Sequence, residues 1–370
     1  MQRLAPLLAL LAGFWLASAH AATPAEADYI IRLNAAPLRP LPGAAASVPS
    51  APATLPAVPV ANPPAAAGTA LPGPAPIAVL LPLQHAGLQE AAQVVRAGIM
   101  AARQAEHGPE VIVYDTDGQQ QVASAYQAAL KQGARVVIGP LTRSAVAGIV
   151  PLVKAVPTLA LNALDGLPPR PQLYSLSLAA DHEARQSATD MRAAGIQRPL
   201  VVTGPGGLDA RLARAFVNAW TVDGSHQLPA SVQYDSPALP ALAATADGAF
   251  LALSQPLLAP ALPARLPRYA TSQLRVTPLP PVLAGTRVPD MPWLIDPQRP
   301  VVQRYPRPAE PLTPATERLY ALGIDAYRLA AELMNGPMAS GRMFDGVTGE
   351  LVLAHDRQFR RQLPVSVLEP

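Results

Sequence analysis

The segment Ile77–Leu83, with the sequence IAVLLPL, constrains the fold more than any other part of this chain. It is a continuous apolar run of strand length, with β-branched residues at Ile77 and Val79. Such a run is typical of a strand that is buried on both faces, as in a parallel sheet covered by helices. We therefore expect Ile77–Leu83 to be the first, central strand of an α/β domain.

Helix-like and strand-like segments alternate after this strand. Apolar residues recur at helical spacing over 88–105 and again over 120–131. Strand-like runs lie between or after these helices at 111–114, 135–138 and 158–161. Serial βα units of this kind predict a mostly parallel, doubly wound sheet with right-handed connections.

The alternation restarts at about residue 171, which predicts a second lobe of similar design. Strands are expected at 173–176 and 200–202, with a helix at 183–194 that Asp181 would cap. Further strands are expected at 231–234, 249–253 and 268–270, and whether a helix forms near Pro240 is left open. A long helix is then expected at 316–333, followed by a terminal hairpin at 351–353 and 359–363.

The predicted fold is therefore α/β and bilobed, with two doubly wound parallel sheets joined by a hinge. Residues 77–370 would form this domain. Lobe 1 is expected at about 77–170 and 283–345, and lobe 2 at about 171–282 and 346–363.

The first residues have the pattern of a secretory signal peptide. Met1–Arg3 is a short positive start, Leu4–Ala17 is apolar, and Ala19–Ala21 fits a small-x-small cleavage site. The alternative is an uncleaved anchor, but the apolar core is shorter than the roughly 20 residues that a spanning helix needs. Residues 1–21 are therefore expected to be removed on secretion.

Residues 22–76 are expected to be a disordered arm rich in Pro and Ala. Twelve of the 40 residues in Pro37–Pro76 are Pro, and Arg39 is the only charge. Such a segment favours an extended, semi-rigid chain. Within the arm, Ala27–Asn34 is a small apolar island. It could be a short docking strand or helix, or a cluster without a structural role, and the second interpretation is slightly favoured.

Composition excludes several function classes. The net charge is +3, the basic residues are nearly all Arg, and they form no basic stripe with interleaved aromatics, so nucleic-acid binding is not expected. The chain has no Cys, which excludes disulfides, thiol catalysis and a lipid anchor through Cys.

Motifs of enzymes and metal sites find no convincing match. Asp181-His182-Glu183 has metal-ligand types, but consecutive helical residues do not share a face, and positions near a helix N-terminus explain the acids. Gly204–Gly207 lacks the Lys-Ser/Thr of a phosphate-binding loop. We therefore expect no catalytic residue, no metal and no cofactor.

The remaining candidates for ligand binding are polar residues at strand ends, because ligands of open α/β sheets bind beyond the carboxyl ends of the strands. The alternative, which is favoured, is that these residues cap helices and turns. The six candidates are Gln84, Thr116, Thr142, Asn162, Ser254 and Ser272.

The segment DMPWLI at Asp290–Ile295 is apolar and Pro-containing, and it follows an irregular stretch. We interpret it as a crossover that is pinned to one lobe. Asp290 and Trp293 are the residues expected to hold this crossover, with the indole of Trp293 as a core anchor.

Several stretches, in this order, resemble the penicillin-binding-protein activator family of LppC-type outer-membrane lipoproteins. Their order and spacing carry the resemblance, which covers about residues 77–363. The stretches are Ile77–Leu83 with Ala125–Leu141, then Arg268–Leu274, Asp290–Ile295, and Arg318–Leu353.

This resemblance implies a C-terminal domain similar to type I periplasmic binding proteins. It also implies a periplasmic, non-enzymatic protein that docks on a bifunctional penicillin-binding protein, a peptidoglycan synthase, and stimulates it. Association with the outer membrane or cell wall is possible in such a family, although this chain has no Cys to carry a lipid. The alternative function is a solute-binding protein for an amino-acid-like small-molecule ligand, in transport or sensing.

Overall fold

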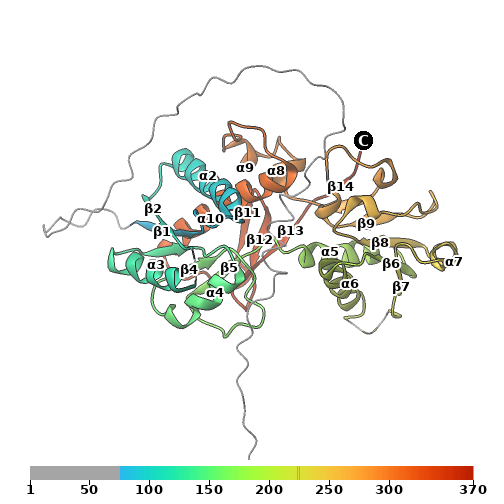
Figure 1. Cartoon of the computed structure of the whole chain (residues 1–370), viewed down its shortest axis with the longest axis horizontal. Coiled ribbons are helices and arrows are strands. Elements are labelled where there is room, and N and C mark those ends of the chain that lie inside the picture. The colour runs from blue at the N-terminus through green and yellow to red at the C-terminus, as the bar shows by residue number, and fades with distance from the viewer. Residues whose placement is uncertain (1–75, 118, 223, 225, 370) are drawn as a thin grey trace, which may run out of the picture.

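The computed structural model describes residues 76–117, 119–222, 224 and 226–369. The predicted signal peptide at 1–21 and the predicted arm, apart from Pro76, lie outside the described residues. The described chain forms two lobes, each built on its own sheet (Figure 1). The predicted bilobed α/β fold with two mostly parallel sheets is confirmed.

The first sheet has eight strands in the order β11-β12-β13-β5-β4-β3-β1-β2. Neighbours from β13 to β2 pair in parallel, whereas β11, β12 and β13 form an antiparallel meander. The strands are β1 (Ile77–Leu81), β2 (Val111–Asp115), β3 (Val136–Ile138), β4 (Thr158–Ala160), β5 (Leu173–Leu176), β11 (Met343–Gly346), β12 (Gly349–Leu353) and β13 (Gln358–Gln362).

Helices cover both faces of this sheet, so every residue of β1 is buried, as its apolar sequence predicts. Strand β1 lies one position from the sheet edge, not at the centre, because β5 and the terminal strands extend the other side. One face packs on α2 (Gln89–Glu106) and α10 (Pro314–Met334), the other on α3 (Gln119–Lys131) and α4 (Arg143–Ile149).

Helices α2 and α10 cross in direct backbone contact. A Cβ atom added at Gly98 would lie 2.0 Å from the carbonyl oxygen of Tyr320, and one at Gly323 would lie 2.2 Å from that of Val95. Only glycine allows this approach, since any side chain would force the helices apart. Thr313 caps α10 by accepting a hydrogen bond from the backbone N–H of Thr316 at 3.2 Å.

The second sheet has six strands in the order β14-β10-β9-β8-β6-β7, all parallel except β14. Helices α5 and α6 cover one face, and α7 with irregular segments covers the other. These elements are β6 (Pro199–Thr203), β7 (Ala230–Gln233), β8 (Gly248–Ala252), β9 (Arg268–Ala270), β10 (Arg287–Pro289), β14 (Val365–Val367), α5 (Ala180–Ala193), α6 (Gly207–Trp220) and α7 (Leu239–Thr245).

Short helices occupy several connections. The helix left open near Pro240 is α7, and Trp293 lies in α8. The short elements are α8 (Pro292–Ile295), α9 (Pro300–Gln303), and the 3-10 turns η1 (Val150–Leu152), η2 (Pro256–Leu258), η3 (Ser272–Leu274) and η4 (Pro281–Leu283).

The lobe boundaries differ from the predicted ones. Strand β5 and the hairpin β12–β13 belong to the first sheet, where lobe 2 had been expected, and β10 belongs to the second, where lobe 1 had been expected. The chain therefore passes to the second lobe after β5, returns after β10, and passes again between β13 and β14. The apolar pattern of a strand indicates a buried face, but it does not indicate which of two sheets receives the strand.

Candidate functional site

The chain crosses between the lobes three times, and the second and third crossings are bonded to each other. The backbone N–H of Asp290, on the second crossing, donates to the carbonyl oxygen of Pro364, on the third, at 3.1 Å. On the third crossing, Leu363 exchanges two hydrogen bonds with the side-chain amide of Gln186 on α5. The second and third crossings are therefore bonded together, and the third is also bonded to α5, the helix that follows the first crossing.

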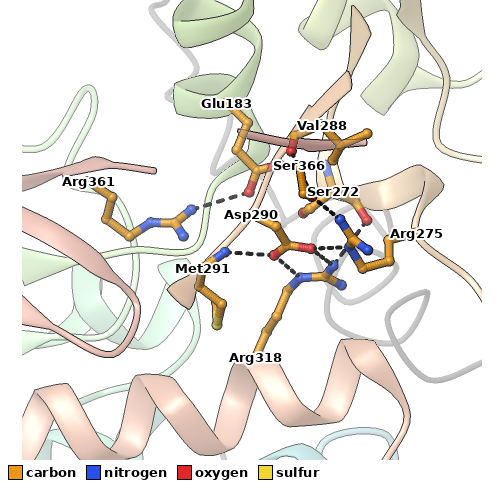
Figure 2. A network of polar contacts seen from close by, with 9 residues as sticks. All are labelled: Glu183, Ser272, Arg275, Val288, Asp290, Met291, Arg318, Arg361 and Ser366. Carbon is orange, nitrogen blue, oxygen red and sulfur yellow. Dashed lines mark hydrogen bonds and ion pairs between the residues drawn. The ribbon is translucent and has the colours of Figure 1, made fainter. Parts of the chain in front are cut away.

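A buried carboxylate, Asp290, lies at the centre of this junction (Figure 2). Its side chain is 1 % exposed. Arg318 of α10 holds both carboxylate oxygens, with Nη2 at 2.6 Å and Nε at 3.1 Å. Arg275, from the second lobe, donates its Nε–H to Oδ2 at 2.7 Å. Because α10 belongs to the first lobe, Asp290 is bonded from both lobes at once.

The arginines decide the charge of Asp290. Burial alone would raise the pKa of this carboxyl, but the charge and hydrogen bonds of Arg318, then Arg275, and the backbone N–H of Met291 together lower it below its usual value. Asp290 is therefore an anion in the folded protein. Bidentate arginine–carboxylate pairing of this kind is strong and geometrically specific.

A second buried pair, Glu183 and Arg361, also joins the lobes (Figure 2). Glu183 lies in α5 and Arg361 in β13, with 3.4 Å between Oε1 and Nη2. Glu183 accepts a hydrogen bond from the backbone N–H of Ser272 at 2.8 Å. Burial raises the pKa of Glu183, with Arg361 opposing that shift. The Nε atom of Arg361 is buried without a hydrogen-bond partner among the described residues.

The two pairs are linked into one network. Arg318 donates from Nη2 to the carbonyl oxygen of Ser272 at 3.2 Å, and Ser272 is also the partner of Glu183. Arg275 also donates to the hydroxyl of Ser366 in β14. Elements of both lobes therefore meet in one set of buried polar contacts, which can fix the angle between the lobes.

The six predicted cleft residues have different surroundings in the structure. Gln84 is exposed, and Thr116 and Ser272 are buried. Thr142 caps α4 by accepting from the backbone N–H of Ala145 at 3.3 Å. Asn162 donates to the carbonyl oxygen of Leu141 and accepts from the N–H of Ala163, and the backbone N–H of Ser254 donates to Asp209. Thr142 and Asn162 thus have the capping and turn roles that were weighed as the alternative.

Trp293, proposed as an anchor of the crossover, is completely buried. Its Nε1–H donates to Oε2 of Glu317 at 2.9 Å, and the guanidinium carbon of Arg307 lies 4.0 Å from the centre of its ring system. The ring also packs against Tyr320. The short helix α8 is thereby attached to α10 in the first lobe, two residues after the crossing at Asp290–Met291.

Four charged members of the network were missed by the sequence analysis: Glu183, Arg275, Arg318 and Arg361. Glu183 had been read as an acid of the first helical turn, and Asp181 as a cap. Helix α5 instead begins at Ala180 after Ala179, and Asp181 pairs with Arg211. Only Arg318 could have indicated the network, because it places a charge on the apolar face of the predicted helix 316–333.

His182 lies near the same junction, among several arginine side chains. Its Nε2 lies 3.3 Å from Nη1 of Arg360. Burial, followed by the nearby charges of Arg361, Arg185 and Arg360, lowers the pKa of His182 to about 3. In the part of the chain that the structure describes, no group of three potential metal ligands occurs.

The first lobe also has a surface depression. It has a volume of about 320 Å³, and its walls come from α2, α10 and the loop after α9. The lining residues are Gln93, Val94, Ala97, Arg307, Pro308, Ala309, Glu310, Leu312 and Tyr320.

Among the described residues, none of the helices has the length and apolar character to cross a bilayer.

Two mostly parallel sheets joined by three adjacent crossings place this protein in the class of periplasmic-binding-protein-like folds. A family model described as "LppC putative lipoprotein" matches residues 71–239 and 239–365. The chain therefore belongs to the LppC family, and the resemblance seen in the sequence is confirmed.

Two solved structures share the fold of this chain. A "putative branched-chain amino acid ABC transporter" from Chromobacterium violaceum ATCC 12472 is 44 % identical, with a TM-score of 0.73 over 80 % of this chain and 100 % of that chain. The LpoA C-domain from Haemophilus influenzae, described as a regulator of PBP1A, has the same fold at 23 % identity, with a TM-score of 0.65 over 79 % of this chain and 97 % of that chain.

The penicillin-binding protein activator LpoA of Enterobacter sp. (strain 638) is 33 % identical over 123 residues. The matched part is 33 % of this chain but only 17 % of that relative. The shared region is therefore a small part of the longer activators.

Proposed function

We propose that this protein is a periplasmic regulator that binds a bifunctional penicillin-binding protein, a peptidoglycan synthase, and stimulates it. Membership of the LppC family supports the proposal, since curated relatives are named penicillin-binding protein activator LpoA. The LpoA C-domain, which has the same fold, is described as a regulator of PBP1A. The periplasmic location rests on the expected signal peptide and on this family.

The observation that carries the proposal is the bonded junction between the lobes. A solute-binding protein of this fold closes over its ligand by a change of the angle between the lobes. Here Asp290 is bonded from both lobes, and two of the three hinge crossings are bonded to each other. Rearranging buried charge pairs is costly, so the junction favours a fixed body that presents its outer surface to a protein partner.

The use of the strand-end residues supports the same function. Thr142 and Asn162 direct their polar atoms to backbone groups: Thr142 to Ala145, and Asn162 to Ala163 and to Leu141 of the neighbouring loop. A receptor for a zwitterion would instead direct charged groups toward its two ends. A regulator that acts by docking needs no reaction of its own, and we propose no enzymatic activity for this protein.

The second candidate is a solute-binding protein for an amino-acid-like ligand. One observation favours it: the 44 % identical relative that matches along its whole length is described as a "putative branched-chain amino acid ABC transporter". The two functions predict different partners, so binding measurements separate them.

The test of the first function is direct binding to a bifunctional penicillin-binding protein, together with the rate at which that synthase cross-links peptidoglycan. We expect binding and a faster rate when this protein is added. A synthase with a single activity provides the matched control partner. Absence of binding and of stimulation for bifunctional synthases would contradict the proposal.

The test of the second function is the melting temperature with each common amino acid at millimolar concentration. Ligand at about 100 times its Kd would stabilise the fold by about 2.7 kcal/mol, which is easily measured. We expect no such shift. Gln84→Ala is the matched variant, because Gln84 is exposed. A shift that this variant abolishes would favour the solute-binding function.

A further inference from the structure

Strand β14 forms one edge of the second sheet, at the opposite side from β7 (Figure 1). Among the described residues no further strand pairs with its outer side. The side chains of Val365 and Val367 are 44 % and 47 % exposed. Because alternate residues of a strand lie on the same face, the two valines are neighbours on one face of the sheet. The edge therefore presents a small apolar surface.

The outer backbone groups of β14 are directed away from the sheet. The carbonyl oxygen of Pro364 and the N–H of Leu368 bond to the residues on either side of β10, at 3.1 Å and 2.9 Å. Bonding direction alternates along a strand, so the N–H and C=O groups of Val365 and Val367 point outward. None of the described strands pairs with these groups.

The usual protection of an edge strand is missing at these two valines. Natural edge strands often carry charges or Pro, which hinder pairing with a further strand. Pro364 precedes β14, but its bonding side faces β10, so the absent N–H does not weaken the outer edge. The nearest exposed charge opposite the valines is Arg287, which lies one strand further in, on β10, and donates to the hydroxyl of Tyr269 at 2.9 Å.

The sequence of β14 is complementary to itself. Val365-Ser366-Val367 reads the same in both directions. An antiparallel copy centred on Ser366 therefore places valine opposite valine and serine opposite serine. Outward-pointing residues that face each other in an antiparallel pair exchange both backbone hydrogen bonds, and cross-strand pairs of β-branched side chains stabilise a sheet. A two-fold axis through Ser366 joins the same surface of both copies, as in most protein dimers.

The other edges suit a second copy less well. Strand β2 is apolar, with the sequence VIVYD, but an antiparallel copy centred on Val113 places Asp115 opposite Val111. Strand β7 exposes the polar residues Ser231 and Gln233. Only β14 combines exposed valines with a sequence that matches its own reverse.

We propose that two copies of this protein pair through β14, antiparallel about Ser366, so that their second sheets join into one continuous sheet. The strand has three residues, and the contact is small beside the roughly 1,200–2,000 Å² of a stable interface. The association is therefore reversible and depends on protein concentration. It uses an edge of the second lobe and is independent of the proposed binding to a synthase.

The test uses the absence of Cys in the full-length chain. Val365→Cys and Val367→Cys are made as separate proteins, and one of the two is isotope-labelled so that mass identifies mixed dimers. Disulfide formation under mild oxidation is then compared for each protein alone and for the mixture. The matched control is a mixture of Val367→Cys with Ser231→Cys, which lies on the edge strand β7.

We expect the mixture of Val365→Cys and Val367→Cys to form disulfide-linked dimers roughly tenfold faster than either protein alone or the control mixture. The two positions face each other with Cα atoms about 5.5 Å apart, which is within disulfide reach. Identical positions are diagonal, about 7–8 Å apart, and lie beyond it. Equal rates would overturn the proposal, and so would a faster reaction of either protein alone, which indicates a different register.

Sedimentation of the full-length protein over a range of concentrations provides a second measurement. We expect the average mass of the wild type to rise with concentration. Val365→Lys combined with Val367→Lys should stay monomeric, because like charges then lie directly opposite each other. Val222→Lys is the matched control, since Val222 is 74 % exposed in the turn after α6, and it should associate as the wild type does.

A wild type that is monomeric at every concentration would overturn the proposal. Equal association of the wild type and the double lysine variant would also overturn it, because it indicates a dimer through another surface. Neither result bears on binding to a penicillin-binding protein, which is measured separately.

Discussion

Asp290 and Glu183 are both buried carboxylates at the lobe junction, and each lies beside arginine, but their surroundings have opposite effects. Asp290 has two guanidinium groups within 2.7 Å, and its pKa is lowered. Glu183 has one at 3.4 Å, and its pKa is raised by burial. The number and closeness of the partners, more than burial itself, decide whether a buried charge stabilises the fold.

The Asp290 side and the Glu183 side of the junction therefore have different roles. The Asp290 side acts as a fixed connection, because its anion has bonds to both lobes. The Glu183 side is weaker, since the pair is long and the Nε atom of Arg361 lacks a partner among the described residues. If the angle between the lobes changes at all, we expect the change to occur on the Glu183 side.

Asp290→Asn gives the largest expected effect. The substitution keeps the shape of the side chain but leaves two arginines without their counter-charge, one of them buried, which should cost about 3–5 kcal/mol of unfolding free energy. Chemical denaturation measures this loss. The matched control is Asp345→Asn, whose side chain is 58 % exposed in its pair with Arg299, with an expected loss below about 1 kcal/mol. Equal losses would contradict the role assigned to Asp290.

Two buried tryptophans differ in whether the indole Nε1–H has a hydrogen-bond partner. Trp293 donates to Glu317, whereas Nε1 of Trp220 is buried with no hydrogen-bond partner among the described residues. Both indoles are completely buried. Trp293→Phe should therefore destabilise the protein by about 1.5–3 kcal/mol more than Trp220→Phe, the value of a hydrogen bond to a charged group. Thermal and chemical unfolding of the two variants provide the test, and similar losses would be the contrary result.

Glu183→Gln should have a much smaller effect than Asp290→Asn. Because burial disfavours the charge of Glu183, a neutral side chain of the same shape is expected to leave the unfolding free energy at neutral pH unchanged or raised, within about 1 kcal/mol. A loss close to that of Asp290→Asn would show instead that Arg361 needs the carboxylate as its counter-charge.

The pH dependence of stability should separate the two acids, because their contributions have opposite signs. The lowered pKa of Asp290 gives stability that is present above the usual value of 3.8 and is lost as the pH falls through the folded-state pKa. The raised pKa of Glu183 gives a contribution that is present below 4.5 and is lost as the pH rises through its folded-state pKa.

Unfolding free energies of the wild type and both variants between about pH 3 and about pH 8 measure these contributions. Asp290→Asn should flatten the loss of stability in acid, and Glu183→Gln should flatten the decline on the alkaline side of 4.5. Parallel curves for all three proteins would mean that neither carboxyl has a shifted pKa.

The fold was largely predictable, since most of it depends on local patterns. The apolar run at Ile77 and the serial βα units indicated two parallel sheets, and Thr142 was identified as a cap. The lobe boundaries were not predictable, because β13 pairs with β5 across almost the whole chain. Such pairing depends on tertiary packing rather than on a local signal.

The junction was predicted only in part. Asp290 and Trp293 stand in a distinctive Pro-containing segment, so they could be singled out. Arg275 and Arg361 lie in ordinary surface-like sequence, and only the approach of the two lobes buries them or brings them to Asp290 and Glu183. A network whose members come from distant segments has no spacing that a sequence can reveal.

The division of strands between the lobes also has a consequence for the order of folding. The five parallel strands of the second sheet all lie within residues 199–289, whereas the first sheet needs β1 at residue 77 and β13 at residue 358, with α10 covering one face. Contacts between such distant segments form slowly. As the chain emerges from its N-terminus, the second lobe can assemble first, while the face of the first sheet that α10 covers stays partly exposed. The first lobe, whose synthesis begins earliest, is thus completed last. During that delay the protein most needs protection from aggregation.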